Sequence, residues 1–186
     1  MEKETNQVSL LSETAERHKR EAPKKLGFAV FVCSTSRFGE WQKKRKIDDP
    51  SGDLIVELLE RAGHTVALRG VLPDDGTVIR QSILKALGTK EVDAMITCGG
   101  TGIGTRDMTI EAVKPLLKKE LPGFGELFRK LSYDEIGSAA LMSRALAGVA
   151  KGKAVFVLPG SPQAVRLCVE RLILPEAPHI VKHARE

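Results

Sequence analysis

The sequence predicts an α/β domain with a mostly parallel central sheet and helices on both of its faces. Short apolar runs of strand length alternate with longer segments in which apolar residues recur at helical spacing. From residue 27 onward the order is strand, helix, strand, helix, strand, which is typical of a parallel sheet covered by helices. Polar or glycine-rich loops follow several of the apolar runs, as they do where strands end at the rim of such a sheet.

The first half of the predicted domain begins with Gly27–Cys33, a continuously apolar run of the kind found in central strands. Asp49 and Pro50 suit the N-cap and the first position of a helix, and Gly63 suits its C-terminal cap. We expect the elements in this order: strand 27–33, polar loop 34–50, helix 50–62, strand 64–71, turn 73–76, helix 78–87 and strand 92–96.

The second half follows a glycine-rich loop. We expect helices around 109–119 and 124–147, a strand at 154–158, a helix from about Gln163 to Ile173 and a short terminal segment. His179 and His183 in that last segment are four residues apart, but no further ligand motif accompanies them. We therefore expect these two histidines to be surface residues.

Length and charge limit the class of protein. The 186 residues, 42% of them hydrophobic, suit one domain with one core, which we assign to residues 26–186. Residues 1–25 are rich in charged and hydroxyl side chains and are expected to form a flexible tail. The net charge of +5 favours anionic partners. Only 4% of the residues are aromatic, which argues against a nucleic-acid partner despite the basic loop 41–46 beside Trp41.

The cysteines and the apolar segments indicate the cellular compartment in which the protein is expected. Cys33, Cys98 and Cys168 are too few for a disulfide framework and too far apart for a metal knuckle, so we expect buried, non-catalytic thiols. No apolar stretch approaches the roughly 20 residues that span a bilayer, and the first 25 residues lack the apolar centre of a signal peptide. The expectation is a cytoplasmic protein with no membrane partner.

Three loops after predicted strands are candidates for a binding site: 34–50, 99–107 and 159–162. If the strands are parallel neighbours, these loops converge at one rim of the sheet. The middle loop follows the segment Thr97–Gly102, whose glycines let a backbone approach a bound phosphate or ring closely. The sequence thus predicts a site for a small anionic molecule.

Asp49 and Asp107 are the acids that we associate with this site, and each has two interpretations. Asp49 before Pro50 can cap a helix, and Asp107 can likewise cap a helix that begins near Thr109. Taken together beside a glycine loop in a basic protein, the two acids also suit a Mg²⁺ ion that bridges phosphates, because hard cations prefer carboxylate oxygens. Both interpretations stay open from the sequence alone.

The ordered set of motifs resembles the molybdenum-cofactor biosynthesis family of the MogA/MoaB type, the molybdopterin adenylyltransferases. The resemblance extends from residue 27 to about residue 175. The residues that carry it are Asp49-Pro50-Ser51-Gly52, Thr97-Cys98-Gly99-Gly100-Thr101-Gly102, Arg106-Asp107-Met108-Thr109, Leu121-Pro122-Gly123-Phe124-Gly125-Glu126, Leu141-Met142-Ser143-Arg144-Ala145 and Leu158-Pro159-Gly160-Ser161-Pro162.

The resemblance implies a three-layer α/β/α domain of the molybdopterin-binding fold that assembles as a homotrimer or as a hexamer of two trimers. It implies Mg²⁺-dependent transfer of AMP from ATP to the terminal phosphate of molybdopterin, with release of pyrophosphate. Asp49 and Asp107 would be the catalytic, Mg²⁺-binding acids. The substrate-binding residues implied by the matching motifs are Ser34, Gly99, Gly100, Thr101, Gly102, Ser143, Arg144, Pro159, Gly160 and Ser161.

Two alternatives accompany this expectation. The segments around Glu126 and Ser143 make the chain similar to MoaB, and some proteins of that type are not the main adenylyltransferase of their organism. A non-catalytic molybdopterin carrier or scaffold is therefore the second hypothesis. The resemblance fits either molybdenum or tungsten as the eventual metal, and it implies a downstream metal-insertion protein as a further partner.

Overall fold

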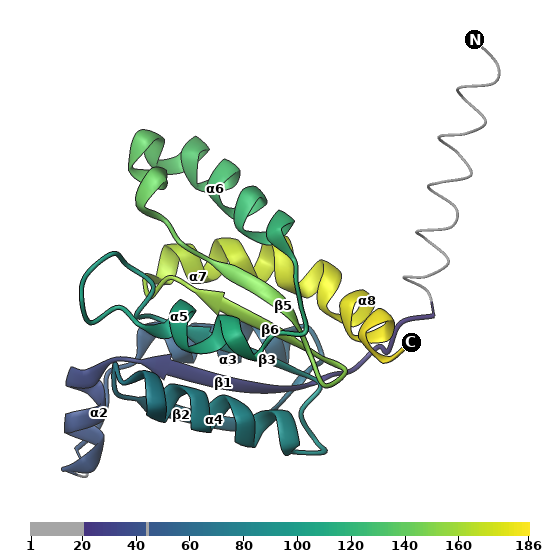
Figure 1. Cartoon of the computed structure of the whole chain (residues 1–186), viewed down its shortest axis with the longest axis horizontal. Coiled ribbons are helices and arrows are strands. Elements are labelled where there is room, and N and C mark those ends of the chain that lie inside the picture. Colours follow the sequence, from purple (N-terminus) through teal and green to yellow (C-terminus); the bar gives the residue numbers. More distant parts are fainter. Residues whose placement is uncertain (1–20, 44) are drawn as a thin grey trace.

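The fold consists of one sheet and the helices that cover it, in a computed structural model that describes residues 21–43 and 45–186 (Figure 1). The strands are β1 (Gly27–Cys33), β2 (Thr65–Leu72), β3 (Ala94–Cys98), β4 (Lys119–Glu120), β5 (Leu146–Ala150) and β6 (Lys153–Leu158). The helices are α2 (Thr35–Gln42), α3 (Pro50–Arg61), α4 (Gly76–Gly88), α5 (Thr109–Val113), α6 (Pro122–Ile136), α7 (Pro162–Cys168) and α8 (Leu174–Arg185). Two 3₁₀ segments, Lys114–Leu116 and Gly137–Met142, follow α5 and α6, and a π-helical segment, Val169–Ile173, joins α7 to α8.

The sheet of the described part has six strands in the order β2-β1-β3-β6-β5-β4. β1 pairs in parallel with both β2 and β3, and β3 pairs in parallel with β6. β5 is antiparallel to both β6 and β4. The predicted mostly parallel sheet is confirmed, with an antiparallel addition at one edge.

Two apolar layers sandwich the sheet, because successive side chains of a strand point to opposite faces. On β1, Phe28, Val30 and Val32 pack against α3, α6, α7 and α8, whereas Ala29 and Phe31 pack against α4 and α5. This alternation explains why the strand is apolar along its whole length: both of its faces are buried. In the described part of the chain no helix has both the length and the apolar character needed to cross a membrane.

Three boundaries differ from the sequence-based expectations in the first two thirds of the chain. α2 lies within the segment that we predicted to be a loop, with Ser34 as its N-cap and no buried residue on any face. The helix predicted at 109–119 ends at Val113. The helix predicted at 124–147 ends at Ile136, because Gly137 takes φ +60, which ends the helix. Of the tail predicted at 1–25, residues 1–20 lie outside the described part, and its flexibility stays a prediction.

The remaining corrections concern the last third of the chain. The predicted helix 124–147 covers the first two residues of β5, and no strand was expected there, but a two-residue turn at Lys151 and Gly152, both with positive φ, folds β5 back onto β6. Gly148 lets β4 approach, since a Cβ at that position would lie 2.5 Å from the carbonyl oxygen of Lys119. The helix predicted to end at Ile173 continues to Arg185.

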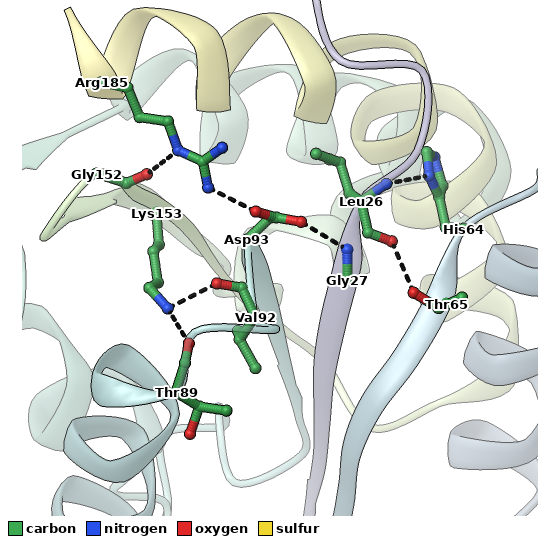
Figure 2. Close-up of polar contacts among 10 residues, drawn as sticks. All are labelled: Leu26, Gly27, His64, Thr65, Thr89, Val92, Asp93, Gly152, Lys153 and Arg185. Atoms are coloured by element: carbon green, nitrogen blue, oxygen red, sulfur yellow. Dashed lines mark hydrogen bonds and ion pairs between the residues drawn. The ribbon is translucent and has the colours of Figure 1, made fainter.

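A polar network ties the amino ends of three strands to the C-terminal helix (Figure 2). Asp93 accepts a hydrogen bond from the Gly27 amide at 2.8 Å and pairs with Arg185 at 2.5 Å. Lys153 donates to the carbonyl oxygens of Thr89 and Val92, and its partial burial lowers its pKa. This end of the sheet is therefore fixed by ion pairs and hydrogen bonds.

His64 belongs to the same end of the sheet. Its Nδ1 accepts a hydrogen bond from the Leu26 amide at 3.2 Å (Figure 2). Its ring centroid lies 5.3 Å from that of Phe28. An Nδ1 that accepts must be unprotonated. Burial lowers the pKa of His64 below its ordinary value of 6.5, so the folded state favours the neutral ring.

We predict that His64 makes the free energy of unfolding fall with acidification. The neutral ring's contribution is complete above pH 6.5 and is lost as the pH falls below it, because the unfolded chain then binds the proton more readily. His64→Asn retains an acceptor for the Leu26 amide but does not titrate. Urea unfolding at pH 7.5 and pH 5.5 should show a smaller difference for the variant than for the parent. An equal difference in both proteins would contradict this role.

Candidate functional site

A pocket of about 450 Å³ lies at the carboxyl ends of β1, β3 and β6. The loops after these strands all contribute to it, as the sequence predicted. Its lining residues are Val32, Cys33, Ser34, Arg37, Asp74, Cys98, Gly99, Gly100, Thr101, Gly102, Asp107, Met142, Ser143, Arg144, Pro159 and Gly160.

Gly99 lies where the three strand ends meet. It has φ +97, and a Cβ at this position would lie 2.5 Å from the carbonyl oxygen of Cys33. On its other side, a Cβ at Gly160 would lie 3.2 Å from the Gly99 Cα. The backbones of three separate loops therefore touch here, and only a residue without a side chain allows the left-handed conformation and the close approach at no cost.

The amides of the glycine loop divide into structural and available groups. Gly99 donates its N–H to the Leu158 carbonyl oxygen at 3.0 Å, so this amide serves the fold and cannot also bind a ligand. Among the described residues, the N–H groups of Gly100, Thr101 and Gly102 have no hydrogen-bond partner. These three amides line a polar pocket and can donate to an anion.

Asp107 lines the pocket and closes its own loop. Its Oδ2 accepts a hydrogen bond from the Gly104 amide at 2.9 Å, and its own amide donates to the Gly104 carbonyl oxygen at 3.0 Å. The N-cap position of α5 is occupied by Met108, which makes no side-chain capping bond. The alternative that Asp107 caps this helix is therefore wrong.

Asp49 is placed differently. It caps α3 through Oδ1, which accepts from the Gly52 amide at 3.0 Å, and its Oδ2 lies 3.3 Å from Nη2 of Arg69. The residue is only 4% exposed and is not part of the pocket lining. The capping interpretation of Asp49 is confirmed, and the residue contacts Arg69, which pairs more closely with Asp53 at 2.5 Å.

Asp74 is a pocket acid that the sequence analysis missed. Its Oδ2 accepts from the Thr35 amide at 2.9 Å and from the Thr35 hydroxyl at 2.8 Å. We had assigned Asp74 to a turn, and the neighbouring Asp75 indeed caps α4. The signal was its position directly after β2, because this strand is parallel to β1 and ends at the same rim.

Two arginines line the pocket. Arg144 donates from Nε to the Thr101 carbonyl oxygen at 2.8 Å and forms a forked pair with Glu111 at 2.9 and 3.2 Å, which lowers the pKa of that carboxyl. It thus fixes the glycine loop. Arg37 donates from Nε to the Asp48 carbonyl oxygen at 2.9 Å. It is a second residue that the sequence analysis did not select.

The predicted serines divide between the pocket and the helix ends. Ser34 and Ser143 line the pocket, and Ser34 also caps α2. Ser161 caps α7 by accepting from the Ala164 amide at 3.2 Å, and it lies outside the pocket lining. Ser51, at the start of α3, donates to the Gly160 carbonyl oxygen at 2.8 Å and so fixes the third loop.

The pocket thiols cannot act as nucleophiles near neutral pH. Burial raises the pKa of Cys33 and of Cys98 to about 12, so both remain protonated. This agrees with the expectation that the cysteines are non-catalytic. In the ranges 21–43 and 45–186, no group of three or more His, Cys, Asp or Glu side chains is arranged to hold a metal ion by itself.

The comparison with known proteins identifies the family. Residues 29–179 match the model of the probable molybdopterin binding domain. Molybdenum cofactor biosynthesis protein B of Bacillus subtilis (strain 168) is 45% identical, over 93% of this chain and 98% of the relative. A relative from Pyrococcus furiosus named molybdopterin adenylyltransferase is 43% identical, over 92% and 98% of the two chains.

A solved structure gives the same result for the fold. The tungsten cofactor synthesizing protein MoaB from Pyrococcus furiosus aligns with a TM-score of 0.78 and 41% sequence identity, covering 89% of this chain and all of that one. The three-layer fold expected from the resemblance is thereby confirmed. With its glycine-lined pocket at the rim of a mostly parallel sheet, the chain belongs to the molybdopterin-binding domain family of molybdenum-cofactor biosynthesis proteins.

Proposed function

We propose that this protein transfers AMP from ATP to the terminal phosphate of molybdopterin and releases pyrophosphate. An oxygen of the pterin phosphate attacks the α-phosphorus of ATP, and the bond from that phosphorus to the pyrophosphate oxygen breaks. The observation that carries the proposal is the convergence, in one pocket, of three amides without a hydrogen-bond partner among the described residues and two carboxylates that form no ion pair there. The Pyrococcus furiosus relative supports it through its name, molybdopterin adenylyltransferase.

The residues of the pocket suit a reaction that needs alignment and charge neutralisation. Because the attacking atom belongs to the substrate, no side chain has to act as a nucleophile, and the protonated thiols of Cys33 and Cys98 are compatible with that. The amides of Gly100, Thr101 and Gly102 would donate to phosphate or pterin oxygens. Arg37 would add positive charge, while Arg144 would hold the loop in place for both substrates.

Asp107 and Asp74 fit a Mg²⁺ ion. Both carboxylates line the pocket, and the hydrogen bonds that they accept come from neutral donors, namely the Gly104 amide and the amide and hydroxyl of Thr35. Within the described part of the chain neither acid forms an ion pair, although Arg37 and Arg144 line the same pocket. Mg²⁺ prefers carboxylate oxygens together with substrate phosphates, and when bound it would neutralise charge on the ATP phosphates.

The assignment of Asp49 as a second Mg²⁺ ligand stays a prediction. Its contacts favour a structural role, since Arg69, shared with Asp53, contacts one carboxylate oxygen and the Gly52 amide donates to the other. Ser161 has a comparable status, because its hydroxyl accepts a capping hydrogen bond outside the pocket. We therefore propose Asp74 in the place that the sequence analysis gave to Asp49.

We further propose that copies of the chain associate, as a trimer or a hexamer. The support is a hollow that Tyr133 of α6 shares with Leu141 of the 3₁₀ segment after it, where both large side chains are exposed to solvent. Leu141 is 85% exposed, and Met142 of the same segment lines the pocket. Exposed apolar residues concentrated in this way mark a site of protein association. The apolar surface is defined by Tyr133 and Leu141, and Leu127 lies elsewhere, beside Phe124 and Ile180.

Asp107→Asn should abolish the transfer while leaving the fold intact. The amide oxygen can still accept from the Gly104 N–H, but the negative charge is gone, and we expect turnover to fall about 100-fold or more. The assay supplies ATP, Mg²⁺ and molybdopterin and measures pyrophosphate and adenylylated pterin, with circular dichroism as the check on folding. If the parent binds the pterin but forms neither product, the carrier hypothesis replaces the proposal.

Asp74→Asn should reduce turnover as strongly as Asp107→Asn, whereas Asp49→Asn should lower the melting temperature and leave the turnover of folded protein nearly unchanged. The reason is that Asp74 lines the pocket and forms no ion pair, whereas Asp49 lies outside the pocket lining and contacts Arg69. Asp75→Asn is the matched control, since it makes the same change one residue along the chain and asparagine also caps helices well. Loss of turnover in Asp49→Asn with full activity in Asp74→Asn would restore the assignment made from the sequence.

Leu141→Glu should shift the protein toward the monomer. A charge on this exposed apolar surface would have to be desolvated on association, which is unfavourable. Light scattering coupled to size-exclusion chromatography measures the mass. Leu84→Glu on α4, an exposed leucine outside this surface, is the control and should keep the parental mass. A monomeric parent would contradict the proposed association.

A further inference from the structure

Thr109, the first residue of α5, carries a buried hydroxyl that the fold leaves unsatisfied. The side chain is fully buried, and its backbone amide donates to the Gly100 carbonyl oxygen at 3.0 Å. Its Oγ1 is the one buried side-chain polar atom in the described part of the chain that has no hydrogen-bond partner. Burying a polar atom without a partner costs free energy, so the presence of this hydroxyl calls for an explanation.

The thiol of Cys33 is a neighbour of this hydroxyl but a poor partner for it. Burial raises the pKa of Cys33 to about 12 and outweighs the opposite effect of Thr109. The thiol therefore stays protonated, and a neutral sulfur is only a weak acceptor. The hydrogen of the Thr109 hydroxyl is left without a strong acceptor.

The hydroxyl lies beside a space that exists because residue 100 is glycine. Gly100 has φ +61, and a Cβ at this position would lie 2.5 Å from Oγ1 of Thr109 and 3.2 Å from Oδ1 of Asp74. Both oxygens therefore border the same small space, which any side chain at residue 100 would fill. A hydroxyl can donate and a carboxylate oxygen can accept, so the two groups are complementary.

Asp74 is held through only one of its two oxygens. Its Oδ2 accepts from the amide and the hydroxyl of Thr35, whereas its Oδ1 accepts from none of the described residues. Carboxylates that ligate a metal ion are usually hydrogen-bonded by a neighbouring residue, which fixes their orientation. A hydrogen bond from Thr109 to Oδ1 would supply the second restraint on this carboxylate.

We propose that Thr109 is a positioning residue for the divalent cation of the pocket. Its hydroxyl donates to Oδ1 of Asp74 when the cation is bound, which requires only a small movement into the space that Gly100 leaves open. Because Thr109 is fully buried, it acts through Asp74 and not by contact with a substrate. This inference rests on the proposed function, since that function places Mg²⁺ at Asp74 and Asp107.

The test measures the affinity of the full-length chain for Mn²⁺, a paramagnetic substitute for Mg²⁺, from the loss of the free-ion signal in electron paramagnetic resonance. Thr109→Val removes the hydroxyl but keeps the shape of the side chain, and it should bind Mn²⁺ about 10-fold more weakly, the usual effect of losing a group that orients a metal ligand. Thr109→Ser keeps the hydroxyl and should bind almost as tightly as the parent. Asp74→Asn should lose most of the affinity, which shows that the ion is bound in the pocket.

Thr97→Val is the matched control. Thr97 is also fully buried, but its hydroxyl donates to the Phe156 carbonyl oxygen at 3.2 Å. Losing that hydrogen bond should lower the melting temperature by about 2–4 °C and leave the affinity for Mn²⁺ unchanged. Thr109→Val should show the reverse, namely weaker Mn²⁺ binding with an unchanged or higher melting temperature, because the hydroxyl that it removes is unsatisfied.

The dependence of turnover on Mg²⁺ is a second readout. Thr109→Val should need about 10-fold more Mg²⁺ for half-maximal turnover and should reach the parental rate at saturation, which a purely structural role would not produce. The inference is overturned if the parent shows no saturable Mn²⁺ binding, or if Thr109→Val or Asp74→Asn binds Mn²⁺ as tightly as the parent. It is also overturned if Thr109→Ser loses as much affinity as Thr109→Val. A parent that binds Mn²⁺ through Asp74 but transfers no AMP would contradict the proposed function and leave the role of Thr109 intact.

Discussion

The close backbone contact at Gly99 is the constraint on which the pocket depends. Parallel pairing brings Val32, Cys98 and Leu158 side by side, so the three strands end together. The chains that leave them would collide if any side chain pointed inward at Gly99. A glycine removes the obstacle, and the next residues turn with their amides directed to the pocket instead of to the sheet. The anion-binding capacity of the loop thus follows from how closely three backbones can pack.

The distribution of ion pairs separates acids that hold the fold from acids that are available for chemistry. Asp49 faces Arg69, Asp93 faces Arg185, and Glu111 faces Arg144. Asp74 and Asp107 accept hydrogen bonds only from neutral donors among the described residues. In the first group, the contact with an arginine offsets the free-energy cost of fixing the carboxylate side chain in the folded protein. The second group shares its pocket with Arg37 and Arg144 but pairs with neither, so both carboxylates can contact a cation, and this is the physical reason to assign these two acids to phosphate chemistry.

The sequence predicted the buried framework well and the edges poorly. The strands at 27–33 and 154–158 could be recognised because both of their faces are buried and their patterns are continuous. β5 could not, because Leu146–Ala150 is equally suited to a helix and its pairing is decided by the turn at Lys151 and Gly152. α2 buries none of its residues and so leaves no apolar stripe. Asp74 was hidden for a different reason: its neighbours have the composition of a turn, and only the strand order shows that this turn opens on the pocket.

The π-helical segment Val169–Ile173 has a consequence for everything that follows it. Val169, Ile173, Ala177 and Val181 are all buried at a spacing of four residues, and each such step overshoots one turn of an ideal α-helix by about 40°. A wider turn absorbs part of this excess, which keeps the stripe against the sheet to the end of the chain. The π-helical segment therefore sets which face of the last two turns of α8 points toward the sheet. A one-residue insertion or deletion at 169–173 would rotate His179 and His183 by about 100° relative to the sheet without touching either of them.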